Sequence, residues 1–214
     1  MNDENLKLNE KLLEIAKKSL IKNGFEVIEA KNKIEAIEML QNIIAKDATI
    51  GTGGSRTLEE IGFHRIFTTK DYPNFLDRNA PDISSDAQKS IQKRSLTADY
   101  FVCSANSITT DGQLILIDYT GNRNAAATYG PEKRIFVLGW NKITTSLENG
   151  LKRANNTAAV LNNIRFNMSN PCTTVGYCVN CDSKDKLCRI KTIISRCEPA
   201  CSAVILFVKE DLGF

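Results

Sequence analysis

The sequence predicts an α/β fold built on a largely parallel sheet, because apolar runs typical of buried strands alternate with stretches of helical period. The segments expected to form strands are 25–30, 48–50, 100–103, 114–118, 134–139 and 203–208. The 42% hydrophobic share is enough for a packed core. Strands that alternate with helices favour parallel pairing through helical crossovers.

The segments between these runs carry the helical signal. In residues 5–23 apolar and small side chains recur at helical spacing, and Gly24 stands where a glycine ends a helix. Further helices are expected over 32–44, 57–67, 82–95, 122–129 and 145–167. We expect one domain at 25–214, with the helical segment 1–24 as an appendage and a cysteine-rich segment over 172–201.

Composition excludes several classes of function. The 214 residues carry a net charge of +3 with no basic stripe, so nucleic acid is not expected as a partner. The apolar run 203–208 is far shorter than the roughly 20 residues of a membrane span, and the N-terminus has no apolar signal core. A cytoplasmic location is therefore expected, where the seven cysteines indicate metal or redox chemistry rather than disulfides.

The segment GTGGSRTLEE joins an expected strand to an expected helix. Gly53 and Gly54 allow the backbone to approach a ligand closely, and Ser55 and Thr57 add hydroxyl groups. The alternative is a tight turn followed by a capping box between Thr57 and Glu60. Neither the Rossmann nor the Walker spacing fits, so the segment either binds an anion or only turns the chain.

The segment DYTGNRNAAA is a second junction of strand and helix. Asp118 ends the strand, and Asn122 and Arg123 place an amide and a cation at the turn. Ligands of open α/β sheets bind at the carboxyl ends of strands, so the two turns are expected to share a cleft. Alternatively, Arg123 pairs with Asp118 and only holds the turn. Lys142 follows a later strand, where it either neutralises a phosphate or carboxylate or is simply solvated.

Four cysteines lie close together near the C-terminus. Cys178 and Cys181 have the spacing of a metal knuckle, and Cys172 and Cys188 complete a set of four thiols. The intervals match neither a common zinc finger nor the bacterial ferredoxin run. Zinc, an iron–sulfur cluster, a thiol/disulfide pair and inert thiols all remain open. Cys103 lies in an apolar run and is expected to pack as a small hydrophobic residue.

Four stretches resemble the lactate-utilisation (LUD) domain family in its YkgG-like form. IGTGGSRTLEEIGF (50–63) resembles its glycine motif, and 97–143 resembles its most characteristic block. The stretch 170–194 resembles the cysteine segment of the YkgG-like members, and 210–214 resembles their ending. The resemblance implies a three-layer, Rossmann-like, mostly parallel sheet similar to the NagB/RpiA/CoA-transferase superfamily, with an N-terminal helix and a C-terminal cysteine-rich loop.

The resemblance also implies a function. Members of the lactate-utilisation type are associated with oxidation of L-lactate to pyruvate beside iron–sulfur partner proteins. We therefore expect a small anionic ligand at the strand ends and an iron–sulfur protein as partner, with a homo-oligomer left open. The alternative is a non-catalytic subunit whose cysteines hold zinc or an iron–sulfur cluster and which docks a redox partner.

The site residues implied by the resemblance fall into three groups. Those expected to bind the ligand are Gly53, Gly54, Ser55, Thr57, Asn106, Thr109, Gly121, Asn122, Arg123, Asn141 and Lys142. If the chain is an enzyme, Asp118 or Glu60 is expected to transfer the proton. The metal candidates are Cys172, Cys178, Cys181 and Cys188.

Overall fold

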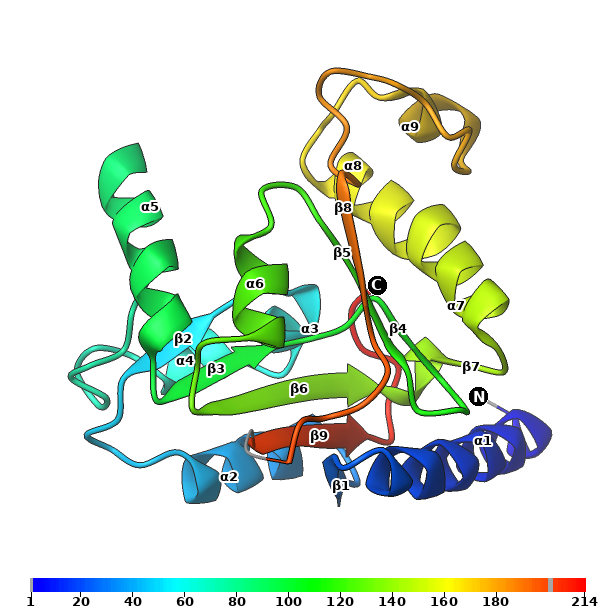
Figure 1. Ribbon diagram of the computed structural model, residues 1–214, viewed down its shortest axis with the longest axis horizontal. Coiled ribbons are helices and arrows are strands. Elements are labelled where there is room, and N and C mark those ends of the chain that lie inside the picture. The colour runs from blue at the N-terminus through cyan, green and yellow to red at the C-terminus, as the bar shows by residue number, and fades with distance from the viewer. Residues whose placement is uncertain (1, 200–201) are drawn as a thin grey trace.

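A parallel sheet forms the centre of the molecule (Figure 1). The computed structural model describes residues 2–199 and 202–214, so Cys201 of the expected cysteine-rich segment lies outside the described residues. Within these residues the central sheet has five parallel strands in the order β1-β9-β6-β3-β2. Its strands are β1 (Glu26–Ala30), β2 (Ile50–Thr52), β3 (Tyr100–Cys103), β6 (Lys133–Gly139) and β9 (Ser202–Val208). The expected α/β class and largely parallel sheet are confirmed.

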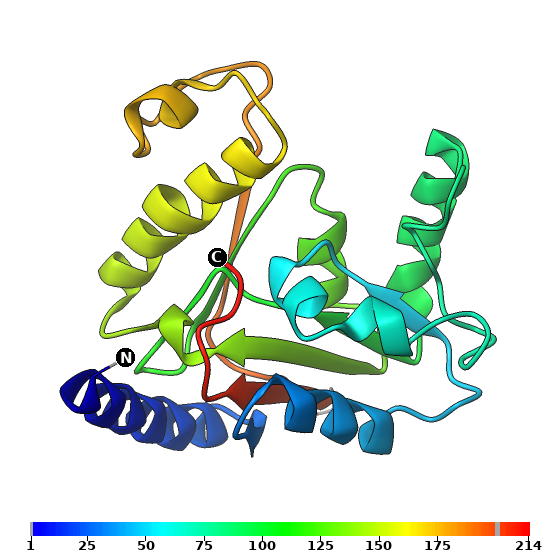
Figure 2. The same ribbon diagram turned by 180° about the vertical axis from the view of Figure 1, so that it is seen from behind.

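Both faces of this sheet are buried, which explains why its strands are apolar throughout. On β6, Phe136 and Leu138 pack with α1 and α6, whereas Ile135 and Val137 pack on the opposite face with α2, α3 and α4. Figure 2 shows α3 and α4 covering that second face. The helices are α1 (Asp3–Lys22), α2 (Lys33–Ile43), α3 (Arg56–Glu60), α4 (Phe63–Ile66), α5 (Ser85–Arg94), α6 (Asn122–Thr128), α7 (Leu147–Arg153), α8 (Val160–Arg165) and α9 (Pro171–Val175). The layers are those of a three-layer, Rossmann-like fold.

A second, smaller sheet stands beside the first. In the described chain it has the order β7-β4-β5-β8, with antiparallel pairs β4–β5 and β5–β8 and a parallel pair β4–β7. Its strands are β4 (Ser107–Thr109), β5 (Leu114–Asp118), β7 (Ile143–Thr144) and β8 (Ile190–Ile194). Only β5 was expected, and it joins this sheet rather than the parallel one. β4 and β7 are too short, and β8 too exposed, to give a clear apolar pattern.

Two expected helices differ in detail. The helix expected over 57–67 is split into α3 and α4, because Gly62 adopts φ 79° between them. The cap of α3 is Ser55, whose Oγ accepts the N–H of Leu58 at 3.3 Å, so the alternative of a capping box between Thr57 and Glu60 is wrong. The helical stretch expected over 145–167 contains a π-helical segment, Ala154–Ala159, between α7 and α8.

The first helix packs on the central sheet. Leu13, Ala16 and Leu20 of α1 belong to the same hydrophobic cluster as Phe136 and Phe207 of the sheet. The helix segment expected to be an appendage therefore contributes to the main core. Among the described residues, no helix is both long enough and apolar enough to cross a membrane.

Shortening a core side chain of α1 tests this packing. Leu20 is 0% exposed, so Leu20→Ala is expected to lower the free energy of unfolding by about 2–5 kcal/mol through a cavity beneath the sheet. Ile21 is 59% exposed, and Ile21→Ala is expected to change it by less than about 0.5 kcal/mol. Urea unfolding measures both. Equal effects of the two changes would contradict the packing of α1 into the core.

Candidate functional site

Three parallel strands end at one edge of the sheet, and each is followed by polar residues. β2 leads into Gly53, Gly54 and Ser55, β3 leads into the segment 104–106, and β6 leads into the turn Trp140–Lys142. Since neighbouring parallel strands run in one direction, these segments meet at the carboxyl edge, where ligands of open α/β folds bind.

Lys142 joins these segments. Its side chain is buried, and Nζ donates hydrogen bonds to Thr57 Oγ1 at 2.8 Å, Ser104 Oγ at 2.9 Å and the carbonyl oxygen of Ala105 at 3.2 Å. These acceptors are uncharged. Burial lowers the pKa of Lys142 well below 10.5, and the charges of Arg153 and Arg123 lower it further. The interpretation of Lys142 as a solvated side chain is therefore wrong.

The glycine turn after β2 packs against Arg123 of α6, the helix that follows the second turn. A Cβ atom on Gly53 would lie 2.6 Å from Cγ of Arg123, so the arginine packs directly on the turn. Arg123 is buried, and its Nη2 donates to Asn106 Oδ1 at 3.0 Å and to the carbonyl oxygen of Ile117. Its Nε is buried without a hydrogen-bond partner in the described residues.

Asp118 caps α6. Its Oδ2 accepts the backbone N–H of Arg123 at 3.0 Å and that of Asn124 at 3.3 Å, and its Oδ1 accepts the N–H of Tyr119 at 3.0 Å. The side-chain hydrogen bonds of Arg123 go to Asn106 and Ile117 instead. The alternative in which Arg123 pairs its charge with Asp118 is therefore not what the described residues show. Asp118 accepts the backbone N–H of Arg123, and not its guanidinium.

Arg78 is a site residue that sequence reasoning missed. Its Nη1 lies 4.0 Å from the position a Cβ atom on Gly54 would take. Burial lowers the pKa of Arg78, Asp118 opposes this, and Arg123 lowers it further, so all three groups share one electrostatic environment. The Nε of Arg78 is also buried without a hydrogen-bond partner in the described chain. Arg78 lies between helices, where no periodic pattern pointed to it.

Arg153 is the second missed residue at this edge. Its Nε donates to the carbonyl oxygen of Asn141 at 3.0 Å, and its Nη1 donates to that of Asn106. Burial lowers the pKa of Arg153 to about 10, whereas Asp211 raises it. The guanidinium therefore fixes the backbone after β3 to the backbone after β6. Only the fold reveals this role, because Arg153 lies on α7, inside a plain helical pattern.

Glu60 and Asn141 hold the C-terminal segment. Glu60 Oε2 accepts the N–H of Gly213 at 2.7 Å, and its Oε1 accepts Arg56 Nε at 3.0 Å. Asn141 Oδ1 accepts the N–H of Leu212 at 3.1 Å. Glu60 also lines an open hollow between α2 and α3. By accepting these two N–H groups, Glu60 and Asn141 hold the C-terminal segment at the edge of the site.

The other expected ligand-binding residues shape turns. Thr109 Oγ1 accepts the N–H of Gln113 at 3.1 Å within the β4–β5 hairpin, so the structure does not bring it to the glycine turns. Gly121 begins α6 with φ 89°, and Asn122 Oδ1 accepts the hydroxyl of Thr120 at 2.7 Å. The residues brought together at the strand ends are Gly53, Gly54, Ser55, Thr57, Arg78, Ser104, Asn106, Arg123, Lys142 and Arg153.

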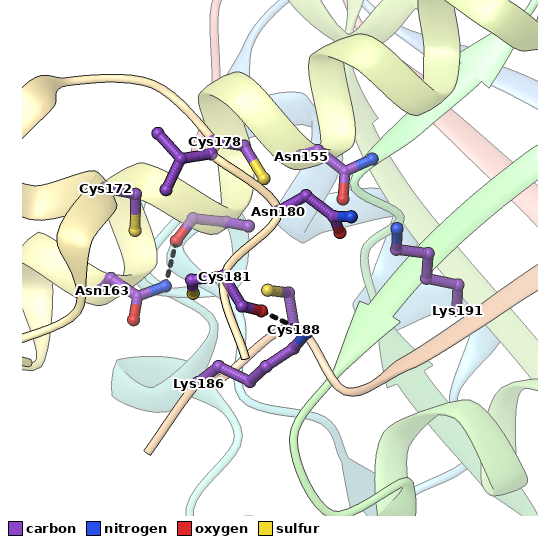
Figure 3. A pocket seen from close by; sticks show the side chains of 11 residues that line it. Asn155, Asn163, Cys172, Cys178, Asn180, Cys181, Lys186, Cys188 and Lys191 are labelled. Carbon is purple, nitrogen blue, oxygen red and sulfur yellow. Dashed lines mark hydrogen bonds between the residues drawn. The ribbon is translucent and has the colours of Figure 1, made fainter. Parts of the chain in front are cut away.

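The four cysteines expected to bind a metal line a pocket away from the glycine turns. Figure 3 shows Cys172, Cys178, Cys181 and Cys188 around one pocket, and no disulfide joins them. Burial raises the pKa of the Cys172 thiol, and the other three cysteines raise it further. In the described part of the chain, no three His, Cys, Asp or Glu side chains are placed to hold a single metal ion. Cys103 is apart from them in the core, where burial raises its pKa to about 12.

The lowered pKa of Lys142 predicts a pH-dependent stability. The unfolded chain binds more protons than the folded one between the lowered pKa of Lys142 and 10.5, so the free energy of unfolding rises with pH across this window. Lys142→Met lacks this contribution. Urea unfolding from about pH 7 to about pH 10 should show wild type gaining stability relative to Lys142→Met. A constant difference would show that the pKa of Lys142 is not lowered.

Comparisons with known proteins agree with this architecture. The model of the LUD domain family matches residues 13–208. The crystal structure of a DUF162 family protein from Deinococcus radiodurans, at 1.70 Å resolution, superposes with a TM-score of 0.55 and 12% sequence identity, covering 94% of this chain and 98% of that chain. That likeness supports the fold. No curated protein matches the sequence. Because the family match spans most of the chain, the protein belongs to the LUD domain family.

Proposed function

We propose that the protein binds a small organic anion at the strand ends, with Arg78 and Arg123 as the anion-binding groups. One observation carries the proposal: each guanidinium has a buried Nε–H with no acceptor in the described residues. A buried donor without a partner costs about 1–3 kcal/mol. The oxygens of an anion between the two arginines would satisfy both donors. They would also offset the burial, and the repulsion from Arg123, that lower the pKa of Arg78.

The surroundings of Arg123 support a preorganised site. Asn106 and the carbonyl oxygen of Ile117 hold its Nη2, and Asp118 fixes the start of its helix. Because Gly53 has no side chain, the guanidinium stem lies against the glycine turn. A side chain held in this way loses little entropy when a ligand binds.

A carboxylate is the ligand class we favour. The planar guanidinium donates paired hydrogen bonds that match the two oxygens of a carboxylate. The association of the LUD family with L-lactate use supports a role in organic-acid oxidation, with an iron–sulfur protein as partner. In this proposal Asp118 is a positioning residue, since its oxygens accept backbone N–H groups.

Binding of L-lactate tests the proposal, with pyruvate and inorganic phosphate as further probes. Isothermal titration calorimetry is expected to show binding of L-lactate to wild type and at least about tenfold weaker binding to Arg78→Met and to Arg123→Met, because each loses a charge-assisted hydrogen bond.

Arg94→Met is the matched control. Arg94 is an exposed arginine at the end of α5, and its replacement is expected to leave binding unchanged. Binding of all three probes that is equal in wild type, Arg78→Met and Arg123→Met would reject the two arginines as the anion site. Binding of phosphate without L-lactate would keep the site and change the ligand class.

A further inference from the structure

We propose that Cys172, Cys178, Cys181 and Cys188 hold an iron–sulfur cluster. The four thiols border one pocket, which also includes Lys186 (Figure 3). They come from α9 and from the irregular segment between α9 and β8, which projects at the end of α7 and α8 (Figure 1). Thiols that come together from the two ends of an irregular segment can ligate one cofactor between them.

A cluster, rather than a single ion, is the centre proposed for these four thiols. Tetrahedral zinc requires its four sulfur atoms at about 2.3 Å from one point. The described side chains bring no three candidate ligands into such an arrangement. An iron–sulfur cluster distributes its four cysteines over several iron atoms, so the sulfur atoms stand further apart around a larger centre. Each thiol releases its proton to solvent when its Fe–S bond forms.

The charges around the pocket suit this cofactor. A cluster ligated by four thiolates carries net negative charge, which nearby cations stabilise. Lys186 and Lys191 line the pocket, and Lys186 Nζ donates to the carbonyl oxygen of Cys181 at 2.9 Å. The basic residues of this segment are Lys184, Lys186 and Arg189, with Lys191 following on β8, against the acidic Asp182 and Asp185.

Asparagine side chains hold the segment in place without a metal. The backbone N–H of Cys178 donates to Asn156 Oδ1 at 2.9 Å from the π-helical segment. Asn170 is 1% exposed, and its Nδ2 donates to Asn163 Oδ1 at 2.6 Å and to the carbonyl oxygen of Asp185 at 3.1 Å. These bonds involve none of the four thiols, so replacing a thiol is expected to leave the fold intact.

The test is anaerobic reconstitution of the full chain with ferric iron, sulfide and a thiol reductant, which reduces part of the iron so that the cluster contains both ferrous and ferric iron. We expect bound iron and acid-labile sulfide in equal amounts and a broad absorption band at roughly 400 nm. Cys178→Ser and Cys181→Ser should each lose the band. Cys103→Ala should keep it, because that thiol lies in the core away from the pocket. Arg123→Met should also keep it, which separates this site from the anion site.

Three results would overturn the proposal. One is a folded wild-type chain that takes up no sulfide, and another is stoichiometric zinc without sulfide. The third is full cluster content in both serine variants. Circular dichroism of each variant before reconstitution shows whether it is folded. If both serine variants are unfolded, the iron and sulfide content of wild type decides the question.

Discussion

The arrangement of the candidate site depends on one buried lysine, Lys142, which follows β6 and donates hydrogen bonds to residues that follow β2 and β3. Lys142 comes directly after β6, and its Nζ reaches Thr57 beyond β2 and Ser104 beyond β3. Parallel pairing alone brings strand ends to a common edge, but it does not fix the loops that follow them. The Nζ hydrogen bonds connect the segment after β2 to the segment after β3. Glu60 and Asn141 separately hold the C-terminal segment through Gly213 and Leu212.

The electrostatics of this edge favour the anionic ligand that we propose. Arg78, Arg123, Lys142 and Arg153 gather there, and burial lowers the pKa of Arg78, Lys142 and Arg153. The nearby carboxylate of Asp118 accepts hydrogen bonds from backbone N–H groups. Buried cations that face one another at low dielectric are unfavourable unless an anion balances them. These buried cations therefore leave an unfavourable electrostatic free energy in this region, which a bound anion would reduce.

The second sheet links the strand-end site to the cysteine pocket. β8 begins two residues after Cys188 and pairs with β5 so that Ile190 lies opposite Asp118. The backbone N–H of Arg189 donates to the carbonyl oxygen of Asp118 at 3.1 Å, and the Asp118 carboxylate accepts the backbone N–H of Arg123. The two proposed sites thus share one hydrogen-bonded strand pair, although they lie on different parts of the fold.

The sequence by itself determined the α/β class, the expected strands of the parallel sheet and the two glycine turns, because long apolar runs and glycine junctions are local signals. The family that the sequence motifs resemble, the LUD domain family, is the one whose model matches residues 13–208. Tertiary structure alone decided which polar groups meet. Arg78 comes from a loop without a pattern, Arg153 from an ordinary helix, and Thr109 turns out to serve a hairpin. β4, β7 and β8 were missed because short or exposed strands are specified by pairing across the sheet rather than by their own residues.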